Sequence, residues 1–542
     1  MKMGNVLQKY FGEDEIKLAF CRVDKWSYSQ IKDQIEIRHF KKRFNENCTH
    51  LSERIINGDY SPSRGFKFYM PKPSNTFRTQ TQLLLEDALV YQAIANKLAE
   101  DVTDQLEIHK DQVFGSILRD ECKLGTKLLS ENNPDFNFFK EWKPLHKKFI
   151  NAVMQSIEED QSVYRLETDI TGFFDSIPHY NLFKVLREDF HLEGEIIELL
   201  SECLNAWSGT RDGMTKGVGI PQGPAPSYLL ANLFLHKLDS QLINKGLSYY
   251  RYMDDIKIYG FEKKKMQKLL HTIDKFTKSN GLSINSQKTS IDLMNLNDKE
   301  ETLRSLKKLS MVSFNIDFLS EPFDQKDFQG YKKKMVDLLT DYNRVEDEIF
   351  EMIHESPDGN FSVKKNITDI DLIQQSVKFS ETILSIQHIQ KGFKPDNKLI
   401  PYWLFVLKTY FWRVRGFALT LALYGENDQI KEALISYYQE FEDYEWVRFY
   451  LITNLSFNQK FTQEELKDQI LNYLRNEPDE LPRVALYRLL VVHGTDKELR
   501  AEIERLLKNE NSDHVKRVIA DFKKYRIYDE FHEDILDQYF SL

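Results

Sequence analysis

Three aspartates stand where predicted strands end, so their carboxylates could meet at one point. Asp169 closes the alternating stretch VYRLETD at residues 163–169, and Asp254 and Asp255 lie at the tip of a predicted hairpin over residues 247–259. Mg2+ prefers oxygen ligands, and two divalent cations roughly 3.5–4 Å apart serve nucleotide addition to a 3′-hydroxyl. A solvated acidic turn is the plainer explanation of a lone Asp-Asp pair. The carboxylates therefore indicate nucleotidyl transfer only if other segments support it.

The flanking segments predict a small antiparallel sheet with helices around it. Besides the hairpin, strands are expected at residues 66–70, 163–169 and 282–285. Helical periodicity covers residues 83–106, and another helix is expected to begin near Pro178. Strands that meet at a tight turn would hold the hairpin aspartates on a rigid support.

Four segments, in this order along the chain, resemble the A, B, C and D motifs of reverse transcriptases. They are LETDITGFFDSI (Leu166–Ile177), GIPQGPAPSYLLAN (Gly219–Asn232), YMDD (Tyr252–Asp255) and GLSINSQKT (Gly281–Thr289). Four ordered matches make coincidence a poor explanation. The resemblance covers about residues 60–320. It implies a right-hand polymerase of the α+β class, with fingers and a palm that contains an antiparallel sheet.

The resemblance assigns the metal ligands and a contact to the sugar. Asp169 and Asp254 match the two main ligands of two Mg2+ ions, and Asp255 matches the auxiliary acid of the motif. Phe174 stands five positions after Asp169, where the family has the aromatic side chain that lies under the sugar 2′ position. Its neighbour Phe173 is expected to face the core, and the alternative for Phe174 is that it too is a core aromatic beside Phe173.

Four further residues match nucleotide contacts of the family. Gln222, in the Pro-Gln-Gly turn, matches the residue over the incoming base and template. Lys288 matches the lysine that contacts or protonates the pyrophosphate leaving group. Lys72 and Arg78 match the fingers cations that clamp the triphosphate. A solvated basic loop is the alternative for this last pair.

Some segments depart from the commoner branches of the family. Residues 224–228 (PAPSY) replace the usual Ser-Pro-x-Ser-Pro sequence, and residues 311–320 match the primer grip only loosely. The pair Asn205-Ala206 lacks the nearby histidine expected of retron enzymes. The thumb and the subfamily are therefore less well defined than the palm.

Beyond about residue 345 the sequence predicts helix after helix and no strand. Thr462-Gln463-Glu464-Glu465 has the form of a capping box. Arg448, Arg483 and Arg517 recur every 34 to 35 residues in similar segments, a helical-hairpin repeat length, although an irregular helical domain is the alternative. The predicted domains are an N-terminal helical segment (1–60), fingers and palm (61–320), a connector or thumb-like helix (321–345) and a HEAT-like α-helical repeat domain (346–542).

A palm followed by a long helical region is similar to the bacterial abortive-infection reverse transcriptases, the AbiK-like group. That resemblance implies antiphage defence, homo-oligomers, and template-independent DNA synthesis primed on a protein tyrosine. The expected partners are dNTPs and the DNA product, with an RNA template if one is used. Two alternatives stay open: a reverse transcriptase that copies a dedicated non-coding RNA, and a binding scaffold that has lost catalysis. Tyr10 and Tyr28 are the first candidates for a priming tyrosine.

Bulk composition argues against several other classes. The four cysteines form no CxxC pair, which disfavours a zinc module or a disulfide framework and fits a reducing cytoplasm. The most apolar stretch, residues 402–424, carries three cations in its middle, so a buried helix is expected there and no membrane span. Most of the net charge of −10 falls in the C-terminal part, because residues 1–300 hold 41 Lys and Arg against 42 Asp and Glu. Nucleic acid is then expected to bind in a local cationic channel.

Overall fold

The computed structural model describes most of the chain and divides it into two compact units. The described residues are 3–26, 34–71, 77–158, 163–208, 216–245, 248–294, 328–356, 361–365, 369–390 and 393–524. The first unit consists of Met1–Lys32, Arg43–Lys67 and Thr79–Phe314, and the second of Asp33–Lys42, Phe68–Arg78 and Asn315–Leu542. These units cut across the domain limits expected at residues 60, 320 and 345, which stay a prediction.

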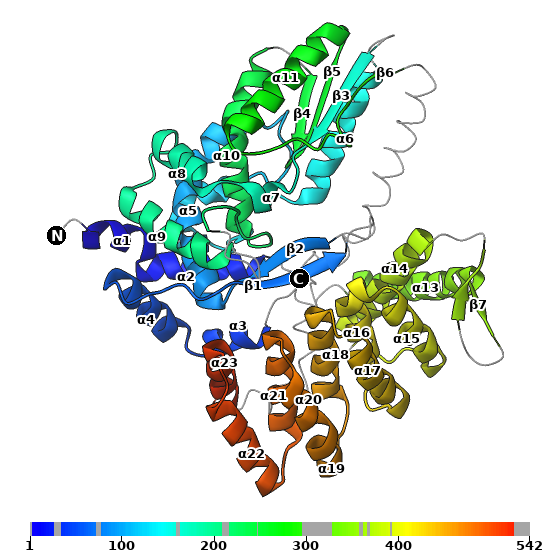
Figure 1. Cartoon of the computed structure of the whole chain (residues 1–542). Coiled ribbons are helices and arrows are strands. Elements are labelled where there is room, and N and C mark those ends of the chain that lie inside the picture. Colours follow the sequence, from blue (N-terminus) through cyan, green and yellow to red (C-terminus); the bar gives the residue numbers. More distant parts are fainter. Residues whose placement is uncertain are drawn as a thin grey trace. The chain divides into compact units, whose positions relative to one another are not determined.

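The first unit is mainly helical (Figure 1). Its most buried helix is α10 (Ala225–Ile243), which has buried residues on all sides, as an internal helix should. Helix α5 (Leu85–Glu107) is also largely buried and confirms the helix expected over residues 83–106. The other helices around them are α1 (Met3–Phe11), α2 (Glu13–Lys25), α4 (Phe44–Ile56), α7 (Phe173–Ser176), α8 (His179–Glu188) and α9 (Gly194–Trp207).

Four antiparallel strands form the sheet of this unit, in the order β4-β5-β3-β6. They are β3 (Val163–Asp169), β4 (Ser248–Tyr252), β5 (Asp255–Gly260) and β6 (Ser290–Met294). The strand expected at residues 163–169 and the hairpin expected at 247–259 are confirmed. The prediction of a strand at residues 282–285 is wrong. This segment makes a single bridge, between Ile170 and Ile284, and the next strand along the chain, β6, begins at Ser290.

The two faces of the sheet differ because side chains alternate along each strand. One face carries Leu166, Ile256 and Ile258, which are fully buried, and helices α10 and α11 (Lys263–Ser279) contact the strands that form it. The other face begins at the aspartates, and helix α6 (Trp142–Glu158) contacts β4 and β5. Phe149 of α6 packs there against Tyr252, with ring centroids 5.8 Å apart.

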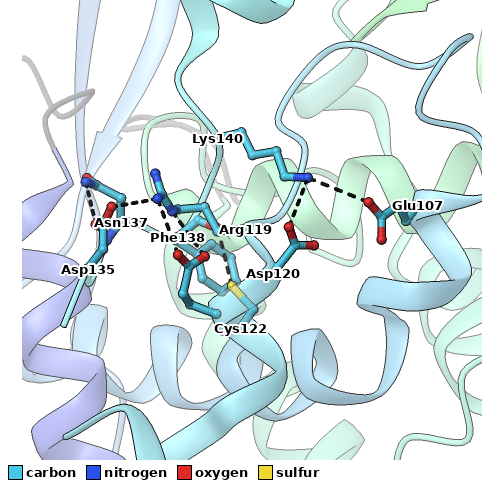
Figure 2. A network of polar contacts seen from close by, with 9 residues as sticks. Glu107, Arg119, Asp120, Cys122, Asp135, Asn137, Phe138 and Lys140 are labelled. Atoms are coloured by element: carbon cyan, nitrogen blue, oxygen red, sulfur yellow. Dashed lines mark hydrogen bonds and ion pairs between the residues drawn. The ribbon is translucent and has the colours of Figure 1, made fainter. Parts of the chain in front are cut away.

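A loop-rich segment between α5 and α6 is held by polar contacts (Figure 2). Arg119 forms an ion pair with Asp135 at 2.7 Å, and Lys140 lies between Asp120 at 3.6 Å and Glu107 at 3.8 Å. The segment includes the 3-10 helix η1 (Asp120–Ser130). Backbone pairing of residues 117–119 with residues 138–140 closes it into a compact loop. This closure fixes the preceding residues, 112–116, which run beside β4.

The second unit begins with α3 (Gln34–Lys42) and otherwise consists mainly of C-terminal helices. A small two-stranded sheet of β7 (Ile353–Glu355) and β8 (Phe361–Val363) contradicts the expectation that no strand follows residue 345. Each of these strands has only three residues, too few to show the alternation of apolar and polar residues that identifies a strand in a sequence. Two further strands, β1 (Phe66–Pro71) and β2 (Phe77–Gln82), pair with each other and contribute residues to both units. Strand β1 confirms the strand expected at residues 66–70. The helices are α13 (Phe328–Met352), α14 (Asp369–Ile389), α15 (Ile400–Thr409), α16 (Val414–Ala422), α17 (Asp428–Glu440), α18 (Glu445–Asn458), α19 (Gln463–Glu465), α20 (Leu471–Asn476), α21 (Glu480–His493), α22 (Lys497–Lys508) and α23 (Asp513–Lys524), with short 3-10 or π turns η3 (Asn397–Leu399), η4 (Phe411–Arg413) and η5 (Leu466–Ile470).

Three helix pairs at the end of this unit begin at regular intervals. Asn427, Thr462 and Asp496 each cap the first helix of a pair through the side chain. The capping box at Thr462 and Glu465 is confirmed. The second helices of the pairs, α18, α21 and α23, contact one another in sequence order. The capping positions are thus 34 to 35 residues apart, like the arginines that suggested a repeat.

None of the helices in the described ranges combines the length and the apolar composition that crossing a bilayer would require.

Candidate active site

Strand register brings the three predicted aspartates to one edge of the sheet. Asp169, at the end of β3, lies directly opposite Asp255, at the start of β5, and directly opposed residues of an antiparallel pair point to the same face. Only Met253 and Asp254 lie between β4 and β5. The side chain of Asp254 is within hydrogen-bonding reach of Asp169. The structure therefore joins residues that are 85 positions apart in the sequence.

The close approach of two acids changes their chemistry. Burial raises the pKa of Asp254 to about 6, and the negative charge of Asp169 adds to the rise. Such a shift is expected where like charges meet without a neutralising cation. Burial also raises the pKa of Asp255, although Lys257, whose Nζ lies 3.8 Å from Asp255 Oδ2, opposes the shift.

These carboxylates suit a divalent cation that takes oxygen ligands. Asp169 and Asp254 offer a convergent pair, and the pKa of Asp254 is raised by burial and additionally by the charge of Asp169, which a cation would neutralise. Within the described ranges, however, no three His, Cys, Asp or Glu side chains converge closely enough to hold a metal ion. The donor set therefore fits Mg2+ through two carboxylates, with Asp255 beside them.

Lys288 lies at the same end of the sheet. Its Nζ donates to Asp169 Oδ2 at 2.8 Å, although the lysine side chain is 67% exposed. Backbone bonds explain this position: Asn285 N donates to Asp169 O, and Thr171 N donates to Ser283 O. The hydrogen bond to Asp169 raises the pKa of Lys288. The predicted proton carrier thus lies beside a predicted metal ligand.

Phe174 lies in α7, where an aromatic neighbour supports it. Its ring packs edge-on against Tyr228, with centroids 5.1 Å apart, and Tyr228 in turn contacts Trp26 at 5.9 Å. Phe174 is 7% exposed, whereas Phe173 is 2% exposed and packs towards Phe234. The expectation that Phe173 faces the core is confirmed. The role of Phe174 at the sugar stays a proposal.

The turn that contains Gln222 is tied to its surroundings through the backbone. Gln222 O accepts from Thr81 N at 2.8 Å, and Gly223 O accepts from Trp26 Nε1 at 2.9 Å. Gly223 has a φ of 129°, which favours glycine. On the other side of the turn, Ile220 N donates to Phe174 O at 2.8 Å. The turn and α7 are therefore positioned together.

The structure does not test the two predicted fingers cations. Lys72 lies outside the described residues, and Arg78, at the start of β2, is exposed and belongs to the second unit. A cation that the sequence did not single out, Lys67, lies in the first unit and is 8% exposed. Its Nζ donates to Thr81 Oγ1 at 2.5 Å. Burial lowers the pKa of Lys67 to about 8, while Asp175 opposes the shift.

Residues behind the hairpin were also missed by sequence reasoning. Arg251 points from β4 to the buried face of the sheet and contacts Asp239 and Asn232 of α10. Two signals could have found them. Arg251 occupies an inward position in the alternating strand SYYRY, and Asn232 and Asp239 stand seven residues apart, on one side of a helix.

Comparison with known proteins supports the family resemblance. Residues 70–323, a little under half of the chain, match the family described as reverse transcriptase (RNA-dependent DNA polymerase). The chain is 35% identical over 150 residues to the retron Ec86 reverse transcriptase of Escherichia coli, covering 27% of this chain and 42% of that protein. It is 31% identical over 156 residues to the 91 kDa protein in the cob intron of Schizosaccharomyces pombe, covering 28% of this chain and 19% of that one.

The matched segments span less than half the length of each of these curated relatives. Among solved structures, apo telomerase from Candida tropicalis is similar at 10% identity, with 92% of this chain and 72% of that chain covered and a TM-score of 0.32. A TM-score of this size does not establish a common fold. The family match covers the segment that holds the carboxylates, so this part of the chain is similar to reverse transcriptases.

Proposed function

We propose that the protein is an active DNA polymerase that adds dNTPs by a two-metal-ion mechanism and serves antiphage defence. The observation that carries the catalytic part is the meeting of Asp169 and Asp254, with Asp255 in register beside them. A scaffold that had lost catalysis would have no use for clustered acids, which repel one another. The defence role, template-independent synthesis and protein priming rest on the resemblance to abortive-infection enzymes.

The residues of the chain divide the work of nucleotide addition. Asp169 and Asp254 would hold two Mg2+ ions, which supply activation of the attacking hydroxyl and neutralise the triphosphate. Lys288 holds a proton at Nζ beside Asp169 and can deliver it to the pyrophosphate. Phe174 is the proposed barrier to a 2′-hydroxyl, and Gln222 the proposed contact to the base.

Substitution of the hairpin carboxylates tests this proposal. The Asp254→Asn/Asp255→Asn double variant keeps side-chain size and removes the charge that holds Mg2+, so we expect nucleotide incorporation to fall by a factor of 10³ or more, with folding retained. Asp274→Asn, on α11 and paired with Lys278, is the matched control. Near-normal incorporation by the double variant would show that the aspartates do not carry the reaction.

An RNA-templated reverse transcriptase is the second candidate. The similarity to the retron reverse transcriptase favours it, whereas the missing histidine near Asn205-Ala206 disfavours it. Sequencing of nucleic acid that co-purifies with the protein distinguishes the two. A single enriched transcript would support templated synthesis, and its absence together with DNA synthesis from dNTPs alone would support template-independent synthesis.

Protein priming requires a tyrosine that can reach the metal site. Tyr10 is a poor candidate, because it is 2% exposed and its hydroxyl donates to Glu193. Tyr28 lies outside the described residues. If priming occurs on protein, DNA should stay attached to the polypeptide in denaturing gels until protease is added. We expect Tyr10→Phe to leave this attachment intact, and DNA that always runs free of protein would rule priming out.

A further inference from the structure

A buried ion pair lies behind the hairpin that carries Asp254. Arg251 and Asp239 have side chains that are 1% and 3% exposed. Arg251 Nε donates to Asp239 Oδ1 at 2.7 Å, and Nη2 donates to Oδ2 at 2.6 Å. Tyr249 donates its hydroxyl to the same carboxylate at 2.6 Å. This two-point pairing fixes the plane of the guanidinium.

The remaining nitrogen of Arg251 is directed at the hairpin itself. Nη1 donates to Met253 O at 2.7 Å and to Asn232 Oδ1 at 3.0 Å. Met253 has a φ of 55°, a left-handed conformation that is unfavourable for a bulky residue and persists only where its surroundings impose it. The carbonyl held by Arg251 belongs to the peptide that leads directly into Asp254.

The opposite side of the hairpin is held by the segment at residues 112–116. Asn232 Nδ2 donates to Gly115 O at 2.9 Å, so the same side chain that orients Arg251 also anchors this segment. At Gly115, a Cβ atom would lie 2.7 Å from Met253 N, which leaves no room for a side chain. Phe114 N donates to Arg251 O at 2.9 Å. Met253 is thus enclosed by contacts on both sides.

We propose that Arg251 is a positioning residue: oriented by Asp239 and Asn232, it fixes the peptide between Met253 and Asp254 and thereby directs the Asp254 carboxylate towards Asp169. A simple stabilising role would not need this arrangement, because apolar residues of similar volume usually stabilise a core as well as a buried ion pair does. The catalytic part of the inference rests on the proposed polymerase function, but the positioning part does not.

The decisive variant removes both charges together. Arg251→Met combined with Asp239→Leu leaves no unpaired buried charge, so the fold should persist, while Met253 O loses its donor. Arg251→Lys is a second variant, since a compact ammonium on a flexible stem does not reproduce the rigid planar fork that spans Asp239 and Met253 O. Arg22→Met combined with Asn96→Leu is the matched control, because this buried pair of the same unit is joined at 2.7 Å and does not contact the hairpin.

Three measurements on the full-length protein separate positioning from stability. Melting temperature reports the fold, amide hydrogen exchange of peptides that include residues 253–255 reports the hairpin, and titration with Mn2+ alone reports the carboxylates. For both Arg251 variants we expect exchange at the hairpin to become at least tenfold faster and Mn2+ affinity to fall five- to tenfold. Their kcat should fall at least tenfold, with KM for dNTP changed less than threefold. The control should change none of these beyond its melting temperature.

The outcomes are distinguishable from failure of the proposed function. If the wild type incorporates no nucleotide, hairpin exchange and Mn2+ affinity still decide the positioning role. A folded double variant with wild-type exchange and Mn2+ affinity would overturn the proposal. If the double variant does not fold, Arg251→Lys decides in the same way, and an unchanged hairpin in that variant would likewise overturn it.

Discussion

At the scale of single residues, the site consists of side chains whose properties depend on close neighbours. Asp254 is a weaker acid than usual because it is buried and faces Asp169. Phe174 is an edge-on neighbour of Tyr228, a residue that replaces part of the usual Ser-Pro-x-Ser-Pro sequence. Both features lead to predictions that single substitutions can test.

Phe174 should control the choice of sugar. A site that merely tolerates an extra hydroxyl discriminates only about a hundredfold, so commitment to DNA needs a steric clash. We expect Phe174→Ala to raise the ratio of ATP to dATP incorporation tenfold or more, at some cost in overall rate through lost packing. The measurement is the ratio of incorporation efficiencies for the two nucleotides.

Phe173→Ala is the control for this prediction. Its ring is buried against Phe234, so the variant should lose stability and keep the wild-type sugar preference. An unchanged ratio in Phe174→Ala, or a shifted ratio in Phe173→Ala, would refute the assignment of the gate without affecting that of the polymerase.

Asp254 should make the metal-free protein less stable as the pH rises. Its pKa is about 6 in the folded protein and 3.8 in the absence of the fold, so the folded state binds this proton more tightly. The stabilisation is complete below pH 4 and is lost as the pH rises through 6. The quantity to compare is the free energy of unfolding of Asp254→Asn minus that of the wild type, measured in EDTA. This difference should be about 1–3 kcal/mol larger at pH 7.5 than at pH 4.5.

Urea unfolding at several pH values measures this difference. Asp274→Asn, paired with Lys278 on α11, provides the same substitution away from the acid cluster. A difference in free energy of unfolding between Asp254→Asn and the wild type that stays constant from pH 4.5 to 7.5 would contradict the prediction.

At the scale of elements, strong local sequence patterns predict strands correctly, whereas weak patterns do not. The strand Val163–Asp169 alternates clearly and was predicted to the residue, and the hairpin at residues 247–259 followed from aromatic strands around an acidic turn. The short segment after Gly281 has strand-like composition, but only Ile284 forms a bridge. Its position is set by the end of β3, which no local pattern can reveal.

The same limit applies to the candidate site. Asp169, Asp254 and Lys288 could be selected because motif order is visible in the sequence, and the structure brings them together. The contact of Arg251 with Asp239 depends on how α10 lies against β4. The spacing of Asn232 and Asp239 places them on one side of the helix, but buried residues occupy all sides of α10, so the sequence does not show which side faces the strand. Tertiary packing of this kind could not be predicted from one sequence.

A buried ion cluster should hold two of the C-terminal helix pairs together. Arg448 of α18 pairs with Glu477 at 2.6 Å and with Asp479 at 2.5 Å, and all three side chains are at most 7% exposed. Arg448→Met would remove the buried cation that the two acids share. We expect the free energy of unfolding of the second unit to fall by about 3–5 kcal/mol, measured by urea denaturation.

Lys460→Met is the comparison in the same unit. Lys460 pairs with Glu426, but these side chains are 81% and 56% exposed, and exposed pairs contribute only about 0–1 kcal/mol. Equal losses in the two variants would mean that the cluster at Arg448 does not stabilise the helix pairs.

At the scale of the whole molecule, regular helix pairs present broad surfaces suited to association. Ion pairs join successive helix pairs, such as Lys431 with Glu465 and Lys467 with Asp496. Together with the resemblance to abortive-infection enzymes, this arrangement leads us to expect a homo-oligomer. Light scattering at micromolar concentration should give a mass of at least twice the 64.2 kDa of one chain, and a monomeric mass would exclude the prediction.

The make-up of the second unit has a consequence for the time course of synthesis. Helix α3, from the first tenth of the chain, contacts α23, which ends at Lys524. Ribosomes add about 5–20 residues per second, so roughly 25–95 s pass between the synthesis of α3 and that of its partner helix α23. Helix α3, which carries the buried residues Ile37 and Phe40, therefore lacks this partner helix during that interval. Elongation rate and the chaperones that shield nascent chains are therefore expected to influence how much of this protein reaches its native form.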